Sequence, residues 1–356
     1  MEEKRKFPGV ERFLLIATVL IIAMHTAPFS SVNRSLDFVL VRIVARIAIP
    51  ICFMLIGYFI ANGYISMRAC IKKLGIWYIV ANICYLPIMC YTGYFKEGYS
   101  TVKLIKDFLV NGTVYHLWVF PACILGLGIV ALLKRMNKPE LLLYIIGLLY
   151  LIGMLGDSYY RAVLVNPQLD RFYQLLFRIF EYTRNGLFYA PVFLYLGMNV
   201  GKKKWITPYW SLICFLVSLA LMIVEGTILH ALSMQRNDTM YFFLVPCVYF
   251  LFEGMIQDRR PTRLNDRICA ELIYLINPMV IVMVRFFAKM VHMEQWMIEN
   301  SILYFLTVTV VSVGLSKILE LIGTAVHLVH NPGNSMAWVE IGEEITQESV
   351  KRKSLI

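Results

Sequence analysis

A few ionisable side chains fall inside long apolar segments of this chain. His25 lies in a run that begins near residue 13, and Arg42 and Arg46 lie in the next run. Residues four apart share a face of a helix, so the two guanidinium groups are expected on one side. A histidine can take a proton from a hydroxyl, and an arginine can stabilise an oxyanion or bind a carboxylate or phosphate. The same residues would also bind an amino-acid carboxylate on a transport pathway, so both chemistries stay open.

Further polar residues enter the apolar segments from the same side. His116 and Trp118 begin a later segment, and Glu225 lies late in another. Buried ionisable side chains in a membrane are costly and are functional candidates by default. By depth alone, we expect His25, Arg46, His116 and Glu225 to converge on one outward-facing cavity.

Each candidate also has a plainer interpretation. His25 would then be a hydrogen-bonding core residue, and Arg42 would extend to the outer headgroups. Trp118 and His116 would be interfacial residues of an aromatic belt, and Glu225 would pair with an arginine. The sequence leaves these alternatives open.

The segments that carry these residues are long and apolar. Of 356 residues, 59% are hydrophobic and 16% are charged, and the mean hydropathy is +0.66, a balance that excludes an ordinary soluble globular protein. Segments of about 20 apolar residues predict membrane-spanning helices. We expect an all-α, polytopic membrane bundle of about ten helices, over residues 13–31, 37–63, 73–94, 116–134, 140–156, 187–201, 206–229, 239–257, 268–291 and 300–326.

The charge distribution predicts the orientation. The net charge of +11 comes from Lys and Arg clusters between alternate apolar runs, for example residues 4–6, 202–204 and 351–353. Such clusters mark cytoplasmic segments, so both termini are expected in the cytoplasm and no nucleic-acid partner is expected. The cysteines lie in or beside apolar runs without ligand spacing, which predicts buried thiols and no metal site.

One long outer segment, residues 157–186, has helical amphipathic spacing. Phe172, Leu175 and Ile179 alternate with charged residues such as Arg171 and Arg178. This pattern predicts an amphipathic helix on the membrane or a short re-entrant lid.

Several motifs resemble a known family. The runs Leu15–Phe29 with His25 and Val41–Phe59 with Arg42 and Arg46 resemble the first two spans of the acyltransferase family 3 membrane proteins. The run Tyr115–Pro121, with His116 and Trp118, is similar to the start of a later span in that family. The resemblance covers residues 8–326 and implies ten spans, an essential histidine at His25 and functional arginines at Arg42 and Arg46.

Within this family, two motifs look closest to the membrane half of the VanT-type vancomycin-resistance serine racemases. They are Gly156–Tyr160, which contains Asp157, and the run from Tyr182, which contains Arg184, and we add Asp157 and Arg184 to the candidate substrate-binding residues. Met336–Ile341 resembles the opening strand of the racemase domain. We therefore expect a cytoplasmic N-terminus over residues 1–12, a membrane domain over 13–326, and a cytoplasmic tail over 327–356 that resembles the start of a racemase domain.

The sequence departs from the family pattern at two positions. Leu14 stands where a basic residue is common, and Asn277 replaces a histidine before Pro278. No lysine lies in a recognisable pyridoxal-phosphate motif, so racemisation and a bound cofactor are not expected. These departures weaken the enzymatic interpretation.

Three functions follow from the residues and the resemblance. The first is a bacterial plasma-membrane acyltransferase that moves an acyl group from cytoplasmic acyl-CoA to a hydroxyl of a small metabolite or cell-envelope acceptor. The second is a module that binds or transports L-serine for a VanT-type system, with a separate racemase domain as partner. The third is a membrane anchor without activity.

Overall fold

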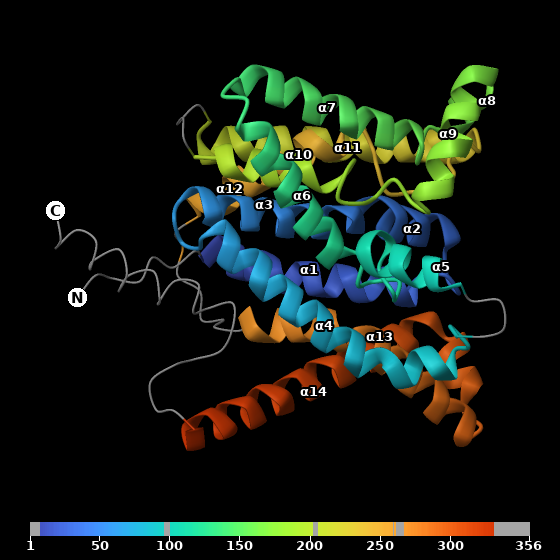
Figure 1. Ribbon diagram of the computed structural model, residues 1–356. Helices are drawn as coiled ribbons and strands as arrows, with labels where there is room; N and C mark the ends of the chain where they lie inside the picture. Colours follow the sequence, from blue (N-terminus) through green and yellow to red (C-terminus); the bar gives the residue numbers. More distant parts are fainter. Residues whose placement is uncertain (1–7, 96–99, 202–205, 259, 261–266, 331–356) are drawn as a thin grey trace. The chain divides into compact units, whose positions relative to one another are not determined.

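The computed structural model describes residues 8–95, 100–201, 206–258, 260 and 267–330. Helices are its only regular elements within these residues, and the all-α prediction is confirmed there (Figure 1). The expected N-terminal segment 1–12 and tail 327–356 lie largely outside the described residues, so their assignment stays a prediction.

The helices follow the predicted apolar segments. The α-helices are α1 (Pro8–Thr26), α2 (Arg34–Phe38), α3 (Ala48–Ala61), α4 (Met67–Tyr91), α5 (Thr101–Lys106), α6 (Val119–Lys134), α7 (Pro139–Leu155), α8 (Tyr160–Leu164), α9 (Pro167–Ile179), α10 (Ala190–Asn199), α11 (Pro208–Ala231), α12 (Leu244–Gln257), α13 (Arg267–Met290) and α14 (Ser301–His330). The segments η1 (Val39–Ile43), η3 (Asp107–Asn111) and η4 (Gln295–Glu299) are π-helical, and η2 (Val44–Ile47) is a 3₁₀ helix.

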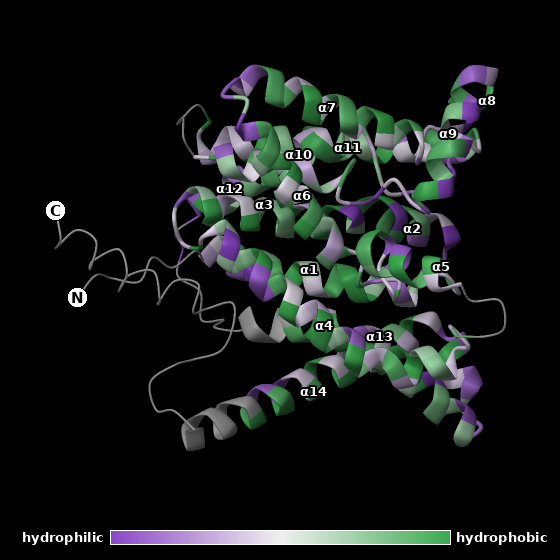
Figure 2. Cartoon of the chain, in the orientation of Figure 1, coloured by the Kyte–Doolittle hydropathy of each residue, from purple (hydrophilic) through white to green (hydrophobic). Residues whose placement is uncertain are grey.

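Six helical segments within the described residues are long and apolar enough to cross a membrane. They are Pro8–Thr26, Arg34–Ala61, Met67–Tyr91, Pro208–Ala231, Leu272–Met290 and Ser301–Ile322. Three shorter helices, α6, α7 and α12, are also apolar, and Figure 2 shows α7 hydrophobic along most of its length. Each predicted segment therefore contains a helix, whereas the number of ten crossings stays a prediction.

The second predicted span is not one regular helix. Between α2 and α3 the backbone forms the π turn η1 and then the 3₁₀ turn η2. Arg42 lies in the first and Arg46 in the second. Interruptions of this kind in a helix often mark functional positions. The sequence pattern predicted a continuous helix here because hydropathy does not detect a change of helical pitch.

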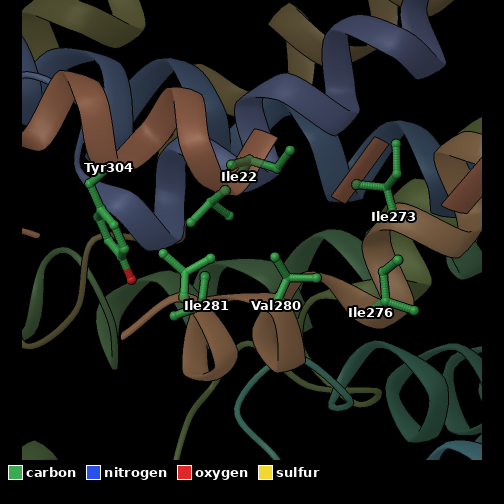
Figure 3. Close-up of a cluster of buried hydrophobic side chains, with 8 residues drawn as sticks. Ile22, Ile273, Ile276, Val280, Ile281 and Tyr304 are labelled. Carbon is green, nitrogen blue, oxygen red and sulfur yellow. The ribbon is translucent and has the colours of Figure 1, made fainter. Parts of the chain in front are cut away.

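The helices group into two compact units. In the first unit, α1 packs on α13 and α14. Ile22 of α1 lies in a buried cluster with Ile273, Ile276, Val280 and Ile281 of α13, and Tyr304 of α14 belongs to the same cluster (Figure 3). This core fixes the helix that carries His25.

The second unit comprises residues 42–58 and 67–252. Its helix α10 packs on α6 and α7, and it approaches α3 closely at two glycines. A Cβ atom at Gly57 would collide with the Leu194 carbonyl oxygen, and one at Gly197 with that of Met54. Small residues that permit such close backbone contact are typical of helix pairs in membranes. The contact holds α3, which follows directly after Arg46.

The predicted amphipathic helix is present as α9. Tyr173 and Leu176 are buried against neighbouring residues of the unit, while Leu169, Phe172 and Ile179 are exposed. An amphipathic helix over part of 157–186 is therefore confirmed, and its position on a membrane stays a prediction. Of the cysteines, Cys70, Cys123 and Cys247 are buried, but Cys84 and Cys90 are exposed on α4.

Candidate functional site

His25 lies in the last turn of α1, in the first unit. The helix ends at Thr26, short of the predicted residue 31, because Ala27 adopts a left-handed φ of 49° and Pro28 follows. Such a residue after the last helical turn is a common helix terminator. His25 is therefore partly buried at a helix end and not in the middle of a span.

The loop after His25 is tied to the start of α14. The Ser301 hydroxyl donates to the Pro28 carbonyl oxygen at 2.8 Å, and the Ser31 and Ser301 hydroxyl oxygens are 2.7 Å apart. Thr26 donates to the Ile22 carbonyl at 2.8 Å within α1. These bonds fix the end of α1 and so restrict the position of the His25 backbone.

Arg42 and Arg46 lie in the second unit and differ in environment. Arg42 is exposed, and its guanidinium is 3.7 Å from a carboxylate oxygen of Asp238. Its carbonyl oxygen accepts a hydrogen bond of 3.0 Å from the Tyr241 hydroxyl. Arg46 is partly buried, and its Nε has no hydrogen-bond partner among the residues that the structure describes. Of the two arginines, Arg46 therefore has a hydrogen-bond donor that a ligand can use.

Arg184 is held against aromatic rings. Its guanidinium carbon is 5.4 Å from the centre of the Trp118 ring and 4.8 Å from that of Tyr182. Asn185 rigidifies this loop, because its amide oxygen accepts from the backbone N–H groups of Leu187 and Phe188. Cation–π contacts orient a guanidinium without neutralising it.

Arg46 and Arg184 lie within electrostatic range of each other, and Tyr241 and Asp157 lie within range of Arg46. The Tyr189 ring, whose centre is 5.9 Å from that of Trp118, is close to both guanidinium groups. We call Arg46 and Arg184 the arginine cluster. Two like charges in this partly buried, aromatic setting favour an anionic group between or beside them.

Asp157 is fully buried just after α7. Its Oδ1 accepts hydrogen bonds from the Thr239 N–H at 2.7 Å, the Met240 N–H at 3.0 Å and the Ser158 hydroxyl at 3.0 Å. Its Oδ2 is bonded to the Thr239 hydroxyl. Burial raises the pKa of this carboxyl above its ordinary value, whereas the bonds from Thr239 and Ser158 and the charge of Arg184 act in the opposite direction.

Glu225 of α11 has a similar arrangement. Its carboxylate accepts from the Phe242 N–H at 2.6 Å, the Phe243 N–H at 2.9 Å and the Tyr159 hydroxyl at 2.6 Å. These N–H groups come directly before α12, where a helix has unsatisfied donors and a partial positive charge. We call Asp157 and Glu225, with the N–H groups of residues 239–243 that they bind, the α12 anchor.

The remaining candidates are packed among aromatic rings. His116 is 3% exposed, with its ring centre 4.9 Å from that of Tyr85 and 5.6 Å from that of Tyr115. Trp118 begins α6 and has an edge-on contact with Phe53 at 6.3 Å. His116 thus packs among aromatic rings and Trp118 lies against Arg184, and a substrate-binding role for either residue stays a prediction.

The structure thus brings Arg46, Arg184, Trp118 and Asp157 into one region of the second unit. His25 belongs to the first unit, so its convergence with Arg46 stays a prediction. Asp238, Thr239 and Tyr241 were missed, although Asp238 lies directly before the predicted segment 239–257 and is a natural partner for an outer arginine. No metal-ligand group of three or more His, Cys, Asp or Glu side chains occurs among the described residues.

The six long apolar helical segments among the described residues define a multi-pass membrane protein. Residues 15–321 match the family Acyl_transf_3, described as an acyltransferase domain. The chain therefore belongs to acyltransferase family 3.

Three curated relatives show a second similarity. Two proteins of Enterococcus faecalis named amino-acid racemase are 35% and 32% identical to the chain over 90% and 89% of its length, and each match covers 46% of the relative. A serine/alanine racemase of Enterococcus gallinarum is 31% identical over 87% of the chain and 45% of the relative. The chain spans about half the length of these relatives. No solved structure matches it.

Proposed function

We propose that this protein is a membrane acyltransferase that moves an acyl group from acyl-CoA to a hydroxyl group of a small metabolite or cell-envelope acceptor. The family supports an acyltransferase-like protein, and the donor and acceptor classes are our proposal. The arginine cluster supports an anionic reactant, because Arg46 Nε has no hydrogen-bond partner among the described residues.

In this proposal His25 acts as the general base. Its imidazole takes the proton of the acceptor hydroxyl while the hydroxyl oxygen attacks the thioester carbonyl carbon. The tetrahedral oxyanion then collapses, the C–S bond breaks, and the CoA thiolate leaves and takes up the proton. Arg46 and Arg184 bind an anionic part of one reactant. No cofactor or metal ion is required for this sequence of steps.

The proposal also includes the location and orientation of the protein. The Lys and Arg clusters between alternate apolar segments support an orientation with both termini in the cytoplasm, and the bacterial relatives support a bacterial plasma membrane. Acyl-CoA is cytoplasmic, so the acyl group would enter from the side of these clusters.

The test is acyl transfer by purified protein in proteoliposomes, measured as release of the CoA thiol with a panel of hydroxyl acceptors. His25→Ala is expected to reduce turnover at least about 100-fold, as for loss of a general base. His230→Ala is a matched control, because His230 also lies in the last turn of a long apolar helix, α11. Full turnover by His25→Ala would refute the catalytic assignment.

A second function is favoured by the named relatives. A serine/alanine racemase shares 31% identity with most of this chain, so the arginine cluster could instead hold the carboxylate of L-serine for binding or transport. A separate racemase domain would then be the partner. Saturable uptake of radiolabelled L-serine that survives in His25→Ala and is lost in Arg46→Gln would support this function. Absence of both activities would leave the anchor interpretation.

A further inference from the structure

Helix α9 is fixed to its unit along its inner side. The Asn166 side chain caps the N-terminus of the helix by accepting from the Gln168 N–H at 2.9 Å. The Tyr173 hydroxyl donates to the Ile152 carbonyl oxygen of α7 at 2.7 Å, and Leu176 packs in the same buried cluster as Tyr173. α9 is therefore a preformed helix attached to α7, which favours a surface helix over a lid.

This attachment places α9 at one end of an apolar helix. Ile152 lies three residues before Leu155, the last residue of α7, which is about 4.5 Å along the helix axis. Along its length α7 exposes Leu143, Leu148 and Leu151, and exposed apolar side chains of a membrane protein indicate contact with lipid. α9 thus lies near the level at which α7 ends (Figure 1), where the interface between membrane and water is expected.

The outward side of α9 carries an apolar strip. Phe172, Leu175 and Ile179 stand at positions i, i+3 and i+7, so they share one face of the helix. All three are exposed, Leu175 by 58% and Ile179 by 61%. None of them belongs to the buried cluster on the inner side. The strip is therefore a second apolar face that the unit itself does not cover.

Two arginines border this strip. Arg171 and Arg178 are two helical turns apart, and Leu175 lies between them at a separation of four and three residues, so the three share one side. Both arginines are exposed, and neither forms an ion pair with a residue that the structure describes. The single acidic residue of α9, Asp170, instead accepts a hydrogen bond from Gln174 at 2.8 Å. The strip therefore has an unpaired basic edge.

We propose that this side of α9 binds anionic phospholipids, with Leu175 and Ile179 at the edge of the hydrocarbon and Arg171 and Arg178 at the lipid phosphates. An apolar face beside basic residues is typical of helices that lie in the membrane interface. Guanidinium groups bind phosphate oxygens through charge-assisted hydrogen bonds, and basic residues near a membrane surface favour anionic lipids. Lys106, whose Nζ donates to the Arg178 carbonyl oxygen at 3.1 Å, brings another cation to this end of α9.

The experiment identifies the lipid beside α9 with an added tryptophan. Phe172→Trp protein is reconstituted in phosphatidylcholine vesicles with a fixed fraction of lipid that has brominated chains, either phosphatidylglycerol or phosphatidylcholine. Bromine quenches a tryptophan that it contacts, and the emission of the wild-type protein is subtracted. Leu148→Trp is the matched control, because Leu148 is exposed on α7, which contains no basic residue. Ile179→Trp replaces Phe172→Trp if that variant does not fold.

Both brominated lipids are expected to quench the Phe172→Trp emission. Phosphatidylglycerol is expected to be enriched about fivefold over phosphatidylcholine at this probe, as one basic residue near an anionic surface would give. The Leu148→Trp emission is quenched without this enrichment. When Arg171→Gln and Arg178→Gln are added to Phe172→Trp, the enrichment is lost and quenching by phosphatidylcholine remains, whereas Arg171→Lys and Arg178→Lys retain the enrichment.

Absence of quenching at both α9 probes would overturn the proposal and would fit a lid or a protein contact instead. Equal enrichment at the Leu148→Trp probe would also overturn it, as would enrichment that survives the loss of both arginines. None of these outcomes depends on turnover, so lipid binding by α9 and acyl transfer are tested separately.

Discussion

The α12 anchor and the arginine cluster are neighbouring polar regions of one unit, and they differ in how their groups are used. In the α12 anchor, the carboxylates of Asp157 and Glu225 accept hydrogen bonds from four backbone N–H groups and three hydroxyls. In the arginine cluster, Arg184 is held only by ring contacts in the described structure, and Arg46 Nε has no partner there.

The difference separates residues that hold the fold from residues that can bind a ligand. A polar group whose bonds are all made to its own chain gains nothing from a ligand, and its removal leaves unsatisfied donors. A guanidinium with unused donors is costly to bury until an anion arrives. The predictions below test this contrast, and each compares stability with ligand binding.

The largest effect is expected for Asp157→Ala. Removal of the carboxylate leaves the N–H groups of Thr239 and Met240 without their acceptor, and the free energy of unfolding should fall by about 3–5 kcal/mol. Denaturant or thermal unfolding in detergent measures this. The matched Asp157→Asn should lose about 1 kcal/mol or less. Equal losses for both variants would show that the charge, and not the set of hydrogen bonds, matters for stability.

Arg184→Ala should affect binding more than stability. A cation–π contact at a partly exposed site contributes about 0.5–1 kcal/mol, so the unfolding free energy changes little. In a titration with dimethyl phosphate followed by tryptophan fluorescence, since Arg184 lies on the Trp118 ring, the half-saturating concentration should rise about tenfold, in line with loss of one charge-assisted contact. Arg236→Ala is the control, because Arg236 also lies over a ring, that of Phe177 at 3.5 Å, but is not part of the cluster. Equal effects of both variants on binding would refute the role of Arg184.

The smallest effect concerns Asp258 in the first unit, where a carboxylate is paired at the surface. Its hydrogen bonds with Arg260 and then with Arg12 hold the pKa of Asp258 well below its ordinary value. Because the pKa of Asp258 is lower in the folded state, its ionised carboxylate stabilises the fold fully above about pH 4. This stabilisation is lost as the pH falls toward the folded-state pKa. Because the pair is partly solvated, Asp258→Asn should cost about 1 kcal/mol at neutral pH.

The difference in the free energy of unfolding between wild type and Asp258→Asn should therefore decrease as the pH is lowered below about 4. Unfolding curves at several pH values measure it. A difference that stays constant with pH would contradict the assignment.

The apolar pattern was sufficient to predict where the helices lie. All ten predicted segments contain a helix, and the amphipathic spacing of 157–186 predicted α9. The apolar pattern did not predict the end of α1 at Thr26, because apolar residues continue to Phe29, although Pro28 is a signal against helix at Ala27. It also missed the π and 3₁₀ turns at Arg42 and Arg46, since apolar residues continue through them.

The candidate site was predictable as a set of residues but not as a set of roles. Depth in the apolar segments identified Arg46 and Glu225, and the family resemblance identified Asp157. Neither signal predicted their different roles, because the N–H groups that bind Asp157 lie more than 80 residues away in sequence. The partner of Arg42, Asp238, is a similar long-range contact.

The most direct test of this account is Arg46→Gln, measured on the same preparation by thermal unfolding and by titration with dimethyl phosphate followed by tryptophan fluorescence. We predict a folded protein with an unfolding temperature equal to or above that of the wild type, since a costly buried charge is removed, and no saturable response to dimethyl phosphate. A strongly destabilised variant, or one that binds the anion as well as the wild type, would contradict the claim that the arginine cluster is the binding site.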